Sequence, residues 1–162
     1  MGELDRVEGW HVANEDRFVS PNVGVGRQGL DDLLDTLDAK DPERVAEFGN
    51  RVVEGYFQKY GIGVISKGVP LVDHRADFLC REGGTYVLVM VYTVVDAGAV
   101  VDAPNDAMAD GRLADYRETA LEFAMGFEGD VDMRLDVFSV NVLTERRTAQ
   151  VHHFIGVCSW EG

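Results

Sequence analysis

The chain has little lysine, few cysteines and no apolar run long enough to cross a bilayer. Its lysines are Lys40, Lys59 and Lys67, and its two cysteines are Cys80 and Cys158. A small secreted domain held together by disulfides usually carries more cysteines, so we interpret both as reduced packing residues. The first residues are acidic and polar, unlike the basic and then apolar start of a secretion signal. These absences favour a cytoplasmic location and no membrane partner.

Positive charge is scarce overall. The chain has 15 Lys and Arg against 29 Asp and Glu, which gives a net charge of −14. Proteins that bind nucleic acid neutralise phosphates with Lys and Arg, and here no basic cluster stands out beyond Arg146-Arg147. The acidity therefore predicts weak or no binding of nucleic acid. The 162 residues, 46% of them hydrophobic, fit one globular domain.

Local patterns predict an α/β fold, with helices flanking a central mixed sheet. Residues 30–37 and 42–60 show helical spacing; Asp41 is placed to cap the second helix and Gly61 to end it. Gly83-Gly84 predicts a tight hairpin. Another helix is expected at 106–125, and residues 1–41 are expected to form an N-terminal extension of a main domain at 42–162. Strands are expected at 62–69, 72–81, 85–95, 135–142 and 151–157.

Four segments carry a resemblance to a known family. Residues 49–61 resemble a helix that reads G-E-x-x-A-x-x-Y-L-x-x-x-G, and residues 74–93 align without a gap to G-E-I-D-L-I-A-x-D-G-x-T-L-V-F-V-E-V-K-T. Residues 104–124 resemble a later helix, and 134–138 with 153–154 resemble two closing strands. In this order the segments resemble the YraN-like family of bacterial proteins, over roughly residues 45–158. The resemblance implies a restriction-endonuclease-like (PD-(D/E)XK) fold.

Nucleases of that fold hold Mg²⁺ with carboxylates, and the metal activates water and neutralises the phosphate. The resemblance places Asn50 and Arg75 where the family has Glu, and Met90 and Tyr92 where it has the Glu and Lys of E-V-K. Asp77 is the one family acid that is retained. A single carboxylate cannot hold Mg²⁺ firmly. The resemblance therefore implies a degenerate member, in which the apolar substitutions Met90 and Tyr92 could simply fill the old cleft.

Two main hypotheses follow. The first is a non-catalytic module that needs no cofactor and binds an unknown protein partner, or a nucleic acid weakly. A dimeric interaction module with no link to nucleic acid is a third possibility. The alternative is a metal-dependent DNA endonuclease with a rearranged site around Asp77. It would use Mg²⁺ or Mn²⁺, with Glu54 one helical turn beyond Asn50 and Asp73 on the strand face of Asp77 as further ligands. We favour the simpler interpretation that Glu54 and Asp73 are solvated surface acids of a very acidic protein.

The C-terminal region contains further polar residues. His152, His153 and Cys158 match no strong zinc spacing, and adjacent histidines on a strand point to opposite faces, so we expect structural roles. Asp136 matches a family position, and structural hydrogen bonding explains it as well as function does.

Overall fold

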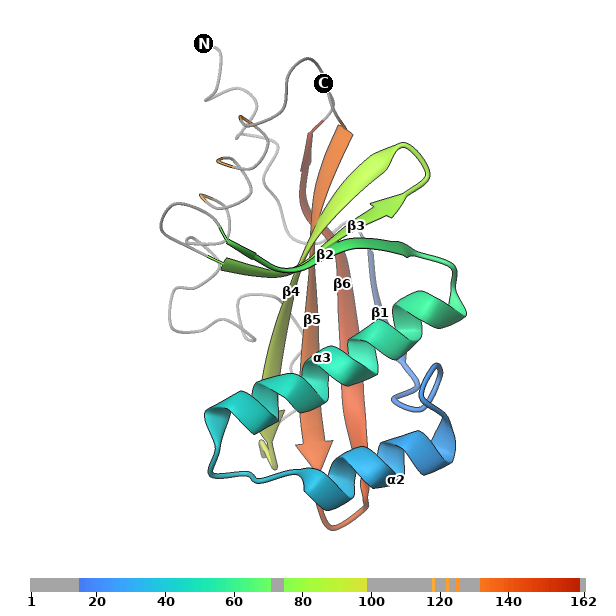
Figure 1. Cartoon of the computed structure of the whole chain (residues 1–162), viewed down its shortest axis with the longest axis vertical. Coiled ribbons are helices and arrows are strands. Elements are labelled where there is room, and N and C mark those ends of the chain that lie inside the picture. The colour runs from blue at the N-terminus through green and yellow to red at the C-terminus, as the bar shows by residue number, and fades with distance from the viewer. Residues whose placement is uncertain are drawn as a thin grey trace.

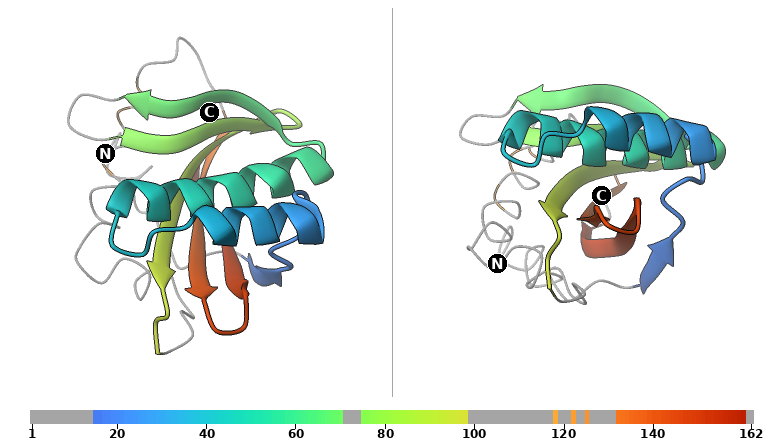
Figure 2. Two further views of the ribbon diagram at one scale, coloured as in Figure 1. Left: turned by 60° about the horizontal axis from the view of Figure 1, so that its bottom comes forward. Right: turned by 90° about the horizontal axis from the view of Figure 1, so that it is seen from below.

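The computed structural model describes residues 15–70, 75–98, 118, 122, 125 and 132–160. In these residues the architecture is α/β: a six-stranded mixed sheet carries helices on one of its faces (Figure 1). In the view turned by 60°, α2 and α3 lie side by side in front of the sheet (Figure 2, left). The elements are, in chain order, β1 (Glu15–Val19), α2 (Gly26–Thr36), α3 (Pro42–Lys59), β2 (Gly63–Pro70), β3 (Arg75–Glu82), β4 (Thr85–Val95), β5 (Asp132–Leu143) and β6 (Thr148–Trp160).

The strand order is β1-β6-β5-β4-β3-β2, which places β4 and β5 at the centre. These two strands run parallel, and the other neighbouring strands pair antiparallel. The predicted hairpin is confirmed, since Glu82 pairs with Thr85 across Gly83-Gly84, and Gly83 has a φ of 59°. A positive φ of this kind costs glycine nothing.

Helix α3 confirms the prediction for residues 42–60. The Asp41 side chain accepts hydrogen bonds from the Glu43 and Arg44 amides, and Pro42 occupies the first turn. The helix lies directly on β4, because a Cβ added to Gly49 would be 1.8 Å from Thr93 Oγ1. Its face towards the sheet is apolar and buried, and includes Phe48, Val52, Val53, Tyr56 and Phe57.

The core has two parts, one on each face of the sheet. The part under the helices, which we call the helix-side core, joins α2 and α3 to alternate residues of β4 such as Val87 and Val89. The part on the opposite face, the far-side core, contains Leu88, Met90 and Leu135. The continuous apolar sequence of β4 thus reflects burial on both faces, as predicted for a central strand.

The N-terminal region differs from the prediction in two respects. The sequence predicted no helix or strand before residue 30, but β1 pairs with β6 from Glu15↔Ile155 to Val19↔Val151. This strand is short and partly charged, so it carries no periodic signal. Helix α2 begins at Gly26 rather than at residue 30, and it buries Leu30 in the helix-side core. Elements from both sides of residue 41 therefore share one sheet and core, and the boundary at residue 41 stays a prediction.

Part of the expected structure lies outside the described residues. This applies to residues 71–74, including Asp73, and to most of the helix expected at 106–125, where Glu118, Glu122 and Met125 are helical. Among the helices that the structure describes, none has the length and apolar content that a membrane span requires.

Candidate functional site

A cavity of about 550 Å³ opens between α3 and the strands β2 and β3. Asn50 and Glu54 line it from α3, Lys67 from β2, and Arg75 and Asp77 from β3. The structure thus brings together three positions that the resemblance singled out, Asn50, Arg75 and Asp77, with Glu54 from the alternative hypothesis. Asn50 and Glu54 face the same strands because they are one helical turn apart on α3.

The carboxylate of Asp77 is held by donors on two neighbouring elements. Its Oδ2 accepts a hydrogen bond of 2.8 Å from the Val91 amide, and its Oδ1 accepts one of 3.4 Å from Asn50 Nδ2. Burial raises the pKa of Asp77, and the hydrogen bonds from Val91 and Asn50 and the charge of Arg75 offset this only in part. Both oxygens of the retained acid therefore already have protein partners.

The second acid of the cavity, Glu54, is bound by a cation of the chain itself. The Lys67 ammonium group forms an ion pair with Glu54 Oε2. The Glu54 side chain is 18% exposed, so it is better described as a half-buried, paired acid than as a solvated one. Of the other predicted ligands, Asp73 lies outside the described residues. Within the described part of the chain, no three His, Cys, Asp or Glu side chains come close enough to hold a metal ion.

Met90 and Tyr92 do not line this cavity. Met90 is 1% exposed and belongs to the far-side core, and Tyr92 packs against that core. Val89 and Val91 alternate with them and join the helix-side core, towards α3. The contact of Asp77 with β4 is made by the backbone of Val91, so side chains at 90 and 92 cannot meet it there.

Comparison with known proteins supports the family resemblance. No protein-family model matches the chain. A UPF0102 protein of Beutenbergia cavernae is 27% identical to it over 122 residues, which cover 75% of this chain and 99% of that protein. The chain is a homologue of this UPF0102 protein. UPF0102 is the YraN family, the one that the four sequence segments resemble.

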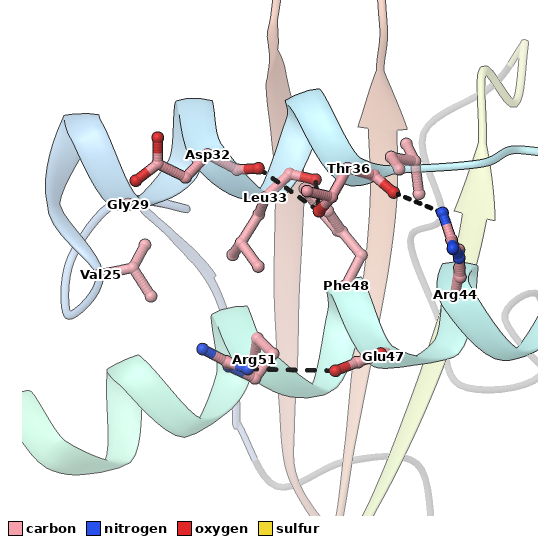
Figure 3. A pocket seen from close by; sticks show the side chains of 10 residues that line it. Val25, Gly29, Asp32, Leu33, Thr36, Arg44, Glu47, Phe48 and Arg51 are labelled. Atoms are coloured by element: carbon pink, nitrogen blue, oxygen red, sulfur yellow. Dashed lines mark hydrogen bonds and ion pairs between the residues drawn. The ribbon is translucent and has the colours of Figure 1, made fainter.

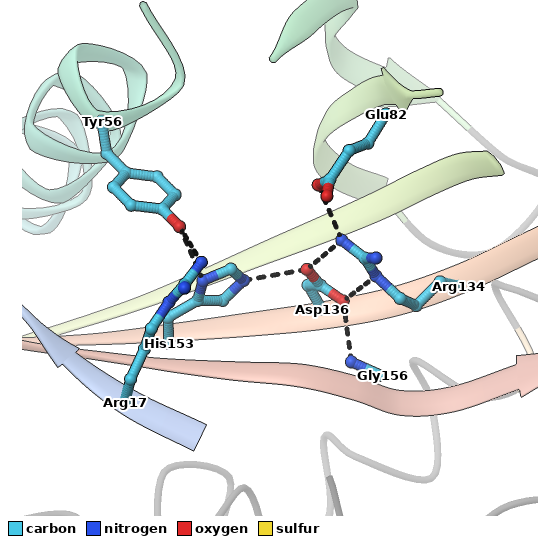
Figure 4. Close-up of polar contacts among 7 residues, drawn as sticks. All are labelled: Arg17, Tyr56, Glu82, Arg134, Asp136, His153 and Gly156. Atoms are coloured by element: carbon cyan, nitrogen blue, oxygen red, sulfur yellow. Dashed lines mark hydrogen bonds and ion pairs between the residues drawn. The ribbon is translucent and has the colours of Figure 1, made fainter. Parts of the chain in front are cut away.

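A second polar cluster, which the sequence did not reveal as such, lies on β5 and β6 (Figure 4). Asp136 is 2% exposed and has four hydrogen-bonding contacts. His153 Nε2 lies 2.8 Å from its Oδ2, the Gly156 amide donates to Oδ1, and Arg134 donates to both oxygens at 2.8 and 3.0 Å. Burial would raise the pKa of Asp136, but the hydrogen bond from His153 and the charge of Arg134 outweigh it, so that the pKa is lowered.

Tyr56 connects this cluster to α3 and β1. Its hydroxyl lies 3.4 Å from His153 Nδ1 and accepts a hydrogen bond from Arg17. When the Tyr56 hydroxyl donates to Nδ1, the Nε2 atom of His153 carries the hydrogen that is donated to Asp136. His153 stacks on Phe138 with ring centroids 3.9 Å apart, so the ring is fixed by packing as well.

The two adjacent histidines face opposite sides of the sheet, as predicted. His152 is within ring-contact distance of Phe18 and Phe154, whereas His153 contacts Phe138 and Tyr56. The side chain of Cys158, the third residue weighed with them, lies outside the described residues. The sequence did not reveal that His153 is a partner of Asp136, because the two residues lie 17 positions apart on neighbouring strands.

A wider groove of about 680 Å³ separates α2 from α3 (Figure 3). Leu33 and Phe48 contribute apolar surface to it. Its charged rim is paired locally: Arg44 donates to the Thr36 carbonyl at 3.4 Å, and Arg51 lies 4.0 Å from Glu47. The groove therefore offers no set of polar groups that converge on one point, and the cavity at Asp77 is the better candidate site.

Proposed function

We propose that this chain is a restriction-endonuclease-like protein of the YraN type that has no nuclease activity and works as a binding module. The homology to a UPF0102 protein and the four motif segments support the family assignment. The order of the elements supports the fold assignment, because α3 is followed by β2 and then by the β3–β4 hairpin. Asp77, which occupies the position of an acid in the family motif, lies beside that helix.

The donors around Asp77 support the loss of catalysis. When a divalent metal is bound in this fold, it activates water and stabilises charge on the phosphate. Mg²⁺ requires about six oxygen ligands in near-octahedral geometry. Here Asn50 presents an NH₂ donor to Asp77, Val91 donates to the other oxygen, and Glu54 is paired with Lys67. The residues present do not fit such a metal, and this is the observation that carries the proposal.

The charge of the cavity supports a binding role and favours a protein partner over DNA. Its lining mixes four acids with three cations, so it presents no continuous positive surface for a polyanion. The net charge of −14 adds a general repulsion of nucleic acid. A protein partner with polar groups of both signs fits this lining better than DNA does. The lining residues with charge are Glu43, Glu47, Arg51, Glu54, Lys67, Arg75 and Asp77.

The test of this proposal is metal binding by the intact chain. Mn²⁺ is titrated into the natural protein and into Asp77→Asn, and heat is followed by calorimetry. We expect no saturable site in either protein at millimolar Mn²⁺. Saturable binding that disappears in Asp77→Asn would instead support the alternative, a metal-dependent endonuclease with a rearranged site around Asp77.

A further inference from the structure

Arg75 is a cation without a partner in the lining of the cavity beside Asp77. It begins β3, and its side chain forms no hydrogen bond or ion pair with any residue that the structure describes. Its charge acts on Asp77, but the two oxygens of that carboxylate accept hydrogen bonds from Val91 and Asn50. The five N–H donors of the Arg75 guanidinium group therefore have no acceptor in the described part of the chain.

A free guanidinium group is not what the charge balance of this chain predicts. Acidic residues outnumber basic ones 29 to 15, so an acid is available for each cation. The other cations of the lining follow this expectation, since Arg51 lies 4.0 Å from Glu47 and Lys67 is bound to Glu54. Arg75 is thus the described cation of the cavity whose donors are available to a ligand.

The backbone of β2 gives the guanidinium group a defined place. A Cβ added to Gly68 would overlap Arg75 Nη2 and would lie 3.2 Å from its Cζ and Nε atoms, so the group lies directly against this glycine. Gly68 also has a φ of 61°, a conformation that residues with a side chain rarely adopt. Glycine at position 68 therefore permits the backbone conformation and leaves room for Arg75 at the cavity wall.

The chemistry of the guanidinium group favours a carboxylate as the ligand. Its planar fork of N–H donors matches the two oxygens of a carboxylate and can bind both at once. A phosphate group also fits the fork, but a polyanion such as DNA would bring many further charges towards an acidic chain. A single carboxylate introduces one negative charge beside one unpaired positive charge, so it complements this cavity better.

We propose that the cavity binds a carboxylate of a protein partner and that Arg75 is the residue that receives it. The inference rests on the proposed function, because it names the group that the binding module recognises. The net charge of −14 favours a partner that is basic as a whole and places one acid at Arg75. That acid is either a side chain or the C-terminus of the partner, which share the same chemistry.

The experiment follows the Nε–Hε signal of Arg75 by NMR while short peptides are added to the full chain. One probe is Gly-Glu-Gly blocked at both ends, and blocked Gly-Gln-Gly is its neutral control. Gly-Gly-Gly with a blocked N-terminus and a free C-terminal carboxylate is the third probe. We expect a saturable shift with a Kd in roughly the millimolar range for a carboxylate peptide and none for the Gln peptide. Saturation by the first or by the third probe alone assigns the carboxylate to a side chain or to a C-terminus.

Matched variants locate the effect, with the backbone amide signals of Gly68 and Asp77 as the measure of binding. Arg75→Gln should weaken the binding of the carboxylate peptide at least about tenfold, because the charge-assisted pair is lost. Arg75→Lys keeps the charge without the fork, so its affinity should lie between the two. Gly68→Ala should also weaken binding, because the added Cβ displaces the guanidinium group. Arg146→Gln removes an exposed arginine between β5 and β6 and should leave the affinity unchanged.

Several results overturn the inference. These are binding that survives Arg75→Gln, equal binding of the Gln peptide, and no saturable shift with either carboxylate peptide. Tighter binding of inorganic phosphate than of the carboxylate peptides does so too, since it would indicate a phosphate-bearing ligand. None of these results decides the absence of nuclease activity, which is contradicted only if the natural chain binds Mn²⁺ at Asp77 or cleaves DNA.

Discussion

His153 Nε2 lies 2.8 Å from Asp136 Oδ2, and both side chains are almost completely buried. The same carboxylate binds Arg134 through two hydrogen bonds. A buried ion pair contributes little when compared with a well-packed apolar replacement, but removing one partner leaves an uncompensated charge. The Asp136 cluster is therefore expected to dominate the response of this fold to polar substitutions.

Asp136→Ala should lower the free energy of unfolding by about 3–5 kcal/mol, because Arg134 and His153 lose their buried acceptor. Urea denaturation followed by circular dichroism measures this change. Glu82→Ala is the matched control: Glu82 also pairs with Arg134, at 3.2 Å, but is 52% exposed. It should cost no more than about 1 kcal/mol. Equal costs for the two variants would show that burial of the pair is unimportant.

The stability contributed by Asp136 should depend on pH with a definite sign. The folded-state pKa of Asp136 is lowered, so its contribution is present above the unfolded pKa of about 3.9. It is lost as pH falls from there through the folded pKa. The difference in unfolding free energy between the natural chain and Asp136→Asn should therefore be constant near neutrality and shrink below about pH 4. A difference that widens on acidification contradicts this account.

The contact between α3 and β4 leaves no room at Gly49. A Cβ there would lie 1.8 Å from Thr93 Oγ1, so Gly49→Ala forces the helix away from the strand. We expect a loss of about 1–3 kcal/mol in thermal or urea unfolding despite the higher helix propensity of alanine. Thr93→Ala in the same chain removes the clashing oxygen and should restore part of that loss. Additive costs in the double variant would mean that the two positions do not touch.

Cys80 should be chemically inert in the folded protein. Burial raises the pKa of its thiol to about 12, so almost no thiolate exists at pH 8. Iodoacetamide should leave the peptide that contains Cys80 unmodified under native conditions and modify it fully in denaturant, as read by mass spectrometry. Rapid modification of the native chain would show that this part of the core opens readily.

The parts of the fold that the sequence predicted are those with strong local signals. Asp41-Pro42 marks the start of α3, and the apolar run of β4 identified the central strand. Strand β1 was missed because it has five residues, some of them charged, that form a strand only through pairing with β6. The start of α2 was missed for a similar reason, since the helix begins with Gly26 and polar residues, and tertiary packing of Leu30 stabilises it.

The candidate site was predictable in part for the same reasons. The resemblance placed Asn50, Arg75 and Asp77 in one site, and the structure brings them to one cavity. It also assigned Met90 and Tyr92 to that site, but a strand that is almost continuously apolar does not reveal which alternate set of side chains faces the helix. The Lys67–Glu54 pair depends on how β2 lies against α3, which no local pattern specifies.

The measurement that tests the central claim most directly is cleavage of single-stranded, flapped and four-way-junction DNA in Mg²⁺ and in Mn²⁺. The natural chain and Asp77→Ala are assayed side by side at equal concentration. The account predicts no cleavage above the level of the Asp77→Ala protein with any substrate or metal. Cleavage by the natural chain that Asp77→Ala abolishes would contradict it and establish a working nuclease centre at Asp77.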